Sequence, residues 1–318
     1  MQQDLENIKV YYSSGFWAQS LGHPLLVAAF SLGILLLLQS TIPLLIRNLC
    51  EVFTGYHLEN ALKPEASPLW KTVYKLLLSL SQLFVFGCSA LIFSYWSDNF
   101  RKEIGFETST HLPLVVLAGL LTLVGQPLTL SLVIDSQTFE LPPSLHSLES
   151  QIEEMEHSIQ TKLNVLLDKQ LGINLLVFAL VPAVSEELFF RGFLQNTLLR
   201  FLAPHTAVIL TSLLFSFLHF QFLGFLSRFL LGIFFGYLSL WHKNLLPPIA
   251  AHFTNNAFHV TLAFFKAQNP NFRKLLAPEN TSDIPYAWIL FSAISCAVIM
   301  HLFYYYSHLT PTHGREHE

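Results

Sequence analysis

The residues best suited to chemistry lie inside apolar segments in the C-terminal half of the chain. They are Glu186, Glu187 and Arg191 in one segment, His219 at the end of a second, and His252 and Asn256 in a third. Ionisable groups in an apolar environment are costly and therefore usually face a helix-bundle interior or a water-filled cavity. The pattern predicts a buried polar site assembled from three segments.

The first of these segments carries two adjacent carboxylates and an arginine. Glu187 and Arg191 are four residues apart, so on a helix they share one face in the favourable order, with the acid first. We expect Glu187 to neutralise Arg191. Glu186 is rotated from Glu187 by about 100° and can face another group. Because two adjacent, poorly hydrated carboxylates cannot both ionise cheaply, the pKa of one should rise towards neutrality. A general base that works near pH 7 needs a pKa in that range.

The other two segments supply imidazole and amide groups. His219 follows Phe215 by four residues, and His252 and Asn256 are also four apart, which places each pair on one helix face. Converged on one cavity, these groups could activate a water molecule and stabilise the oxyanion of a tetrahedral intermediate. Alternatively, Glu186, His219 and His252 could hold a metal ion such as Zn²⁺, because imidazole and carboxylate are zinc ligands. The chain has no His-Glu-x-x-His signature that would favour the metal.

Composition places these segments in a membrane. Hydrophobic residues make up 52% of the 318 residues and charged residues only 12%, against about 25% in soluble proteins. The net charge of −4 and the absence of a basic cluster longer than Arg101-Lys102 argue against a nucleic-acid partner. Cys50, Cys88 and Cys296 form no disulfide or metal-binding pattern, and we expect them to be small buried apolar residues. The sequence thus predicts an integral membrane protein in contact with lipid.

The segments that position the candidate residues are long enough to cross a bilayer, which takes about 20 mostly apolar residues in a helix. Eight are predicted, at residues 25–46, 73–96, 112–134, 173–199, 207–222, 223–241, 247–265 and 286–306. We therefore expect an all-α polytopic fold in which residues 1–318 form a single membrane domain, located in the cell (inner) membrane. His242, His259 and His301 have no acidic partner nearby in sequence, and we expect them to pack structurally.

An acidic segment at residues 141–170 separates the third and fourth predicted spans. Its apolar residues, including Ile152, Met155, Ile159 and Leu163, recur every three or four positions, which predicts an amphipathic helix. Two interpretations remain open. The helix packs on the membrane domain or at the interface, or it acts as a gate for substrate.

The three polar motifs resemble the pattern of a known family. Glu-Glu-x-x-x-Arg, Phe-x-x-x-His and His-x-x-x-Asn occur in this order at Glu186 to Arg191, Phe215 to His219 and His252 to Asn256. In this the chain resembles the CAAX-protease and bacteriocin-processing (CPBP, or Abi) family of intramembrane proteases. The resemblance covers a catalytic core at about residues 173–265.

The resemblance implies an eight-helix fold that hydrolyses peptide bonds within or at the membrane. It implies that Glu186 acts as the general base with His219, and that His252 and Asn256 stabilise the oxyanion. Glu187, Arg191 and Phe215 would orient the site. The family has been described both as metal-dependent and as a glutamate protease, so Zn²⁺ remains open. The implied partner is a peptide or protein in or at the membrane, lipidated in CAAX-type processing.

Two other functions fit the same residues. Buried Glu and His chains also mark proton and ion pathways in transporters, although no inverted repeat typical of many transporters is visible. Alternatively, the polar pairs only hold helices together in a non-catalytic scaffold.

Overall fold

The computed structural model describes residues 24–90, 111–137, 144, 146–268 and 284–309, and the regular structure in these ranges is entirely helical. The longer helices are α3 (Pro24–Thr54), α4 (Pro68–Gln82), α7 (Leu112–Val124), α8 (Gln126–Gln137), α9 (His146–Leu166), α13 (Pro204–Phe217), α14 (Phe225–His242), α15 (Leu246–Gln268) and α17 (Tyr286–Leu309). A further continuous helical stretch combines α10 (Leu171–Leu175), α11 (Val181–Glu187) and α12 (Asn196–Leu199) with π-helical turns at Leu176–Leu180 and Leu188–Gln195.

The described residues of the eight predicted spans are mostly helical, which confirms the all-α polytopic class, whereas residues 218–224, where the fifth and sixth predicted spans meet, form a turn between α13 and α14. Within the described ranges, four helices are long and apolar enough to cross a membrane, and five if α7 and α8, which meet at a 41° bend, form one span. Helix α13 is apolar but shorter. Residues 91–96, at the end of the second predicted span, lie outside the described residues.

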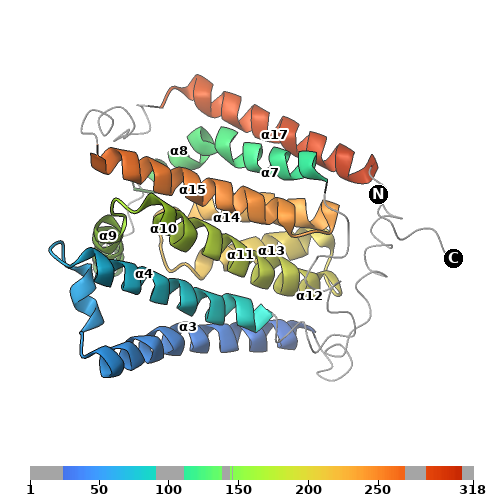
Figure 1. Cartoon of the computed structure of the whole chain (residues 1–318). Coiled ribbons are helices and arrows are strands. Elements are labelled where there is room, and N and C mark those ends of the chain that lie inside the picture. Colours follow the sequence, from blue (N-terminus) through green and yellow to red (C-terminus); the bar gives the residue numbers. More distant parts are fainter. Residues whose placement is uncertain (1–23, 91–110, 138–143, 145, 269–283, 310–318) are drawn as a thin grey trace.

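The helices that carry the candidate residues form the centre of the bundle. In Figure 1, the α10–α12 stretch, α13, α14 and α15 lie between α3 and α4 on one side and α7, α8 and α17 on the other. Helix α15 packs against α7, α14 and α11, and α13 packs against α14. About half of the most apolar part of Leu171–Leu199 is buried, against 11% for α3, so α3 offers most of its surface to lipid.

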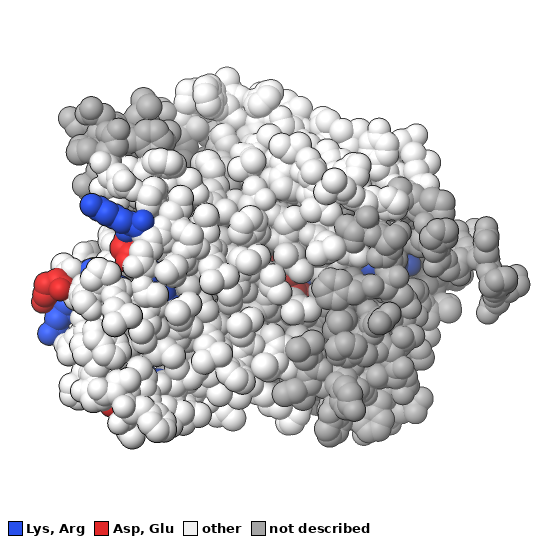
Figure 2. Space-filling view, in the orientation of Figure 1, with Lys and Arg blue, Asp and Glu red and all other residues white. Residues whose placement is uncertain are grey.

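Charged side chains gather at one end of the bundle. Figure 2 shows a broad face without Lys, Arg, Asp or Glu over most of its area, with charges gathered at the end where α9 lies in Figure 1. Helix α9 is seen end-on in Figure 1 and therefore runs across the bundle helices. This arrangement suits an amphipathic helix at the membrane–water interface.

Two contacts attach the α9 region to the bundle. The fully buried Lys75 of α4 donates to Oδ1 of Asp168 at 2.8 Å and to Oδ1 of Asn174 at 2.9 Å, just after α9. On α9 itself, Oε1 of Glu156 accepts a hydrogen bond of 2.6 Å from the backbone N–H of Leu223. Leu223 lies in the turn between α13 and α14, so α9 is fastened close to the residues that follow His219.

Small residues bring α14 close to the central helices. A Cβ atom at Gly232 would lie 3.0 Å from Cβ of Ser212 on α13, and one at Gly236 would lie 2.8 Å from Cγ1 of Val208. The same glycines expose their carbonyls to the π-helical turn. Arg191 donates to the carbonyl of Gly232 at 3.1 Å, and Gln195 donates to that of Gly236 at 3.0 Å.

Candidate active site

Glu186 lies at the centre of the site, near the end of α11 and just before the π-helical turn Leu188–Gln195. Such turns are frequent at functional sites. The Glu186 side chain is almost completely buried. Its Oε1 accepts a hydrogen bond of 2.6 Å from Nε2 of Gln82 on α4. Its Oε2 has no hydrogen-bond partner among the described residues and faces two imidazole rings instead.

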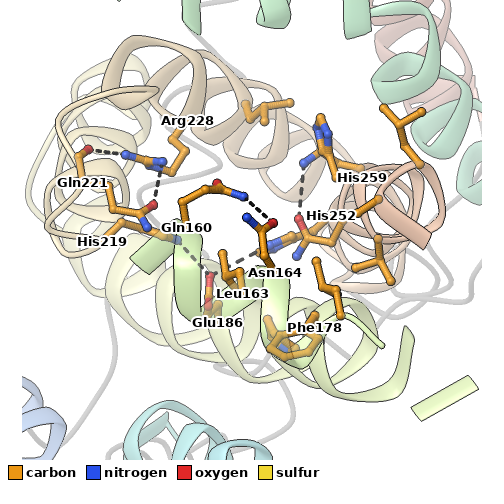
Figure 3. Close-up of a pocket in the computed structure, with 18 of the residues that line it drawn as sticks. Gln160, Leu163, Asn164, Phe178, Glu186, His219, Gln221, Arg228, His252 and His259 are labelled. Atoms are coloured by element: carbon orange, nitrogen blue, oxygen red, sulfur yellow. Dashed lines mark hydrogen bonds and ion pairs between the residues drawn. The ribbon is translucent and has the colours of Figure 1, made fainter. Parts of the chain in front are cut away.

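His219 is the first of these rings. Its Nε2 lies 3.8 Å from Oε2 of Glu186 (Figure 3). Its Nδ1 lies 2.7 Å from the carbonyl oxygen of Phe215, which can only accept, so the proton is on Nδ1 and the lone pair of Nε2 faces Glu186. Phe220, the next residue, has the left-handed φ of 51° that is uncommon outside glycine. His219 thus lies in the turn that follows the end of α13 at Phe217.

His252 is the second ring, and it lies between two carboxylates, of which Glu187 is within hydrogen-bond distance. Its Nε2 lies 3.9 Å from Oε2 of Glu186, and its Nδ1 lies 2.8 Å from Oε1 of Glu187. The same Glu187 oxygen accepts a hydrogen bond of 2.8 Å from Nη1 of Arg191, which is the pair that the sequence spacing predicted. Glu187 and Arg191 are completely buried. Oε1 of Glu187 thus contacts both Arg191, which balances its charge, and His252, whose ring it fixes.

Aromatic rings surround the polar groups on the inner side. Phe215 lies under the guanidinium of Arg191, 4.6 Å from its Cζ to the ring centroid, and contacts His219 and His252 edge-on. Phe235 of α14 stacks on His252, with ring centroids 5.1 Å apart and an interplanar angle of 18°. These rings exclude water and leave each imidazole little freedom to rotate.

Asn256 lies one turn after His252 on α15 and lines the same cavity. Its Oδ1 accepts a hydrogen bond of 3.3 Å from Nδ2 of Asn255, which leaves the Nδ2 of Asn256 as a donor toward the cavity. Asn255 is held in turn by Nε2 of Gln126 on α8, at 3.1 Å. The structure therefore brings together every site residue predicted from the sequence.

The cavity has a volume of about 1060 Å³ and runs from Glu186 to the end of the bundle where α9 lies. Helix α9 forms part of its wall through Gln160, Leu163 and Asn164, which face Glu186 across the cavity in Figure 3. His259, which we expected to have only a packing role, also lines it. Arg228 lines it too, and donates to Oε1 of Gln221 at 3.1 Å.

Sequence reasoning missed Gln82 and Phe235. Gln82 is an isolated amide in an apolar segment, which is a detectable signal, but its contact with Glu186 joins residues 104 apart in sequence. Phe235 is one of 29 phenylalanines, and its residue type alone does not distinguish it as a site residue.

Glu186, His219 and His252 are the candidate metal ligands. In both histidines Nδ1 faces an oxygen acceptor, so Nε2 is available as a ligand, as in many metal sites. Even so, no group of three or more His, Cys, Asp or Glu residues in the described part of the chain is set for coordination. The Nε2 atoms of His219 and His252 lie almost 4 Å from Oε2 of Glu186, which is wider than hydrogen-bond distance and leaves room for a small molecule among the three.

The described helices thus form a membrane bundle in which a carboxylate and two imidazoles meet at a buried, polar cavity. A comparison with protein families adds to this description. Residues 169–258 match the family described as "Type II CAAX prenyl endopeptidase Rce1-like". This stretch is thus similar to a protease family, in agreement with the resemblance seen in the motifs. No curated protein and no solved structure matches the chain.

Proposed function

We propose that the protein is an intramembrane endopeptidase in which Glu186 activates the hydrolytic water. The observation that carries the proposal is the position of Oε2 of Glu186, which faces the Nε2 atoms of His219 and His252 at 3.8 and 3.9 Å. A water molecule that donates one hydrogen bond to Oε2 of Glu186 and the other to Nε2 of His219 is oriented by both groups and can lose a proton to Glu186.

In the proposed reaction, the oxygen of this water attacks the carbonyl carbon of the scissile peptide bond while its proton moves to Glu186. The carbonyl oxygen becomes an oxyanion, for which Asn256 provides an N–H donor and His252 a polar neighbour. Glu186 then gives the proton to the leaving nitrogen, and the C–N bond breaks. His219 accepts a hydrogen bond from the water and assists its deprotonation.

The remaining polar residues would act by positioning His252 and Glu186. Glu187 holds Nδ1 of His252, and Arg191 neutralises Glu187, so that Glu186 is not next to an uncompensated negative charge. Gln82 fixes Oε1 of Glu186 and thereby directs Oε2 into the cavity. Such preorganisation matters because a small misplacement of a reacting group can reduce the rate about 10²-fold.

The family match and the cavity support a substrate that is a peptide or protein embedded in or attached to the membrane, with lipidated C-terminal segments as the first class to test. The cavity volume of about 1060 Å³ is large enough for several residues of an extended peptide. Its opening at the end of the bundle beside α9 would admit a chain end from the interface. We place the enzyme in the cell membrane.

The test is cleavage of reporter peptides by the purified full-length chain in liposomes. A Glu186→Gln variant should lose about 10²- to 10⁴-fold in kcat, the usual contribution of a general base. Glu65→Gln, at an exposed position far along the chain from the motifs, is the matched control and should keep full activity. Full activity of a folded Glu186→Gln variant would remove Glu186 from this role. Ion flux without any peptide product would favour a transporter instead.

A further inference from the structure

Glu186 and His219 border a second, smaller cavity in addition to the main one. This second cavity has a volume of about 160 Å³ and is lined by Gln39, Gln82, Phe86, Glu186, Phe190, Leu218 and His219. We call it the α3–α4 chamber, since Gln39 belongs to α3 and Gln82 to α4. The side chains of Glu186 and His219 thus line both spaces.

The chamber is polar where α3 and α4 meet Glu186. Gln82 donates to Oε1 of Glu186, as described above. Oε1 of Gln39 is buried and has no hydrogen-bond partner among the described residues. A buried amide oxygen without a donor costs about 1 to 3 kcal/mol, so it calls for a ligand that can donate a hydrogen bond.

The size of the chamber fits water better than a peptide segment. A water molecule occupies about 30 Å³ in the liquid, so several fit in this volume, whereas an extended peptide of several residues does not. Water in such a site typically makes about three hydrogen bonds to polar groups. The polar residues that line the chamber are sufficient for this: Gln39, Gln82, Glu186 and His219.

Hydrolysis inside a membrane creates a need for such a chamber. A peptide that fills the main cavity also blocks the route by which water reaches Glu186 from the interface. One water molecule is nevertheless consumed for every bond that is cleaved. A store on another side of the same carboxylate would supply that molecule while substrate is bound.

We infer that the α3–α4 chamber is a water site that delivers the hydrolytic molecule to Glu186, with Gln39 and Gln82 as its binding residues. This inference depends on the proposed peptidase function. It assigns a role to two residues of the N-terminal half, which lies outside the matched residues 169–258.

Cysteine labelling tests whether the chamber is wet, and it requires no enzymatic activity. In a chain whose Cys50, Cys88 and Cys296 are replaced by alanine, Gln39→Cys is treated in liposomes with a small charged thiosulfonate reagent. Because only the thiolate reacts and hydrocarbon suppresses it, we expect Gln39→Cys to react at least about tenfold faster than Leu37→Cys. Leu37 lies two residues away on α3 and is 61% exposed, toward lipid. Equal or slower labelling of Gln39→Cys would overturn the inference.

Steady-state kinetics test what the water does. Gln39→Leu keeps the size of the side chain but removes the acceptor, and should lower kcat about five- to tenfold with KM unchanged, as expected for loss of one hydrogen bond. A raised KM with unchanged kcat would show that the chamber holds part of the peptide and would overturn the inference. If labelling is fast but the wild-type chain cleaves no peptide, the chamber is wet and the proposed function fails.

Discussion

Nδ1 of His252 lies 2.8 Å from Oε1 of Glu187, which joins α15 to α11 through a buried carboxylate. The same oxygen accepts a hydrogen bond from Arg191, so a single atom links the charge balance of the site to the orientation of an imidazole. Stability and activity should therefore respond differently when this carboxylate is changed.

Glu187→Gln leaves Arg191 completely buried without its counter-charge. Removing one partner of a buried ion pair costs about 3 to 5 kcal/mol. We therefore expect the free energy of unfolding in detergent to fall by a similar amount. The double variant Glu187→Leu with Arg191→Met removes both charges and should recover most of this loss, because apolar replacements of buried pairs are often neutral.

Cleavage activity should stay low in that double variant, since Nδ1 of His252 has lost its acceptor. Peptide cleavage and thermal unfolding measured on the same samples separate the two effects. An active double variant would show that Glu187 serves only to neutralise Arg191.

Gly236→Ala should destabilise the bundle, because the new Cβ atom would lie 2.8 Å from Cγ1 of Val208 and 2.9 Å from Oε1 of Gln195. Overpacking of this kind typically costs about 1 to 3 kcal/mol. Gly172→Ala is the control, since no atom lies within 4 Å of the added Cβ there. Thermal unfolding in detergent gives both values, and equal midpoints for the two variants would contradict the close packing of α13 and α14.

Leu163→Trp tests whether α9 borders the path of the substrate. Leu163 lines the main cavity, so a larger side chain should narrow it and raise KM several-fold, while Glu186 and therefore kcat are left unchanged. Met155→Trp, at an exposed position on the same helix, should leave both constants as in the wild type. The same KM in both variants would favour a helix that only packs on the membrane domain, the other interpretation of the acidic segment.

Metal removal tests the mechanism directly. Because the proposed reaction uses Glu186 as the base, dialysis against a strong chelator should leave the cleavage rate unchanged, and elemental analysis should find less than one bound Zn²⁺ per chain. Loss of activity that Zn²⁺ restores would instead assign Glu186, His219 and His252 as ligands.

Local sequence patterns were sufficient for the helices and for contacts within one helix. The apolar segments predicted each described span, and the four-residue spacing predicted the pair of Glu187 and Arg191, because helical geometry alone determines which residues share a face. The order of the three motifs also led to the protease family that residues 169–258 match.

Contacts between distant helices could be decided only by the packed bundle. Gln82 meets Glu186 across 104 residues, His252 meets Glu187 across 65, and α9 meets the turn after His219 through Glu156 and Leu223. No periodicity encodes such pairs, since they depend on crossing angles and on the close approach that Gly232 and Gly236 permit. The spacing of residues along the chain determines which side chains share a helix face. The packing of the helices determines which side chains of other helices contact that face.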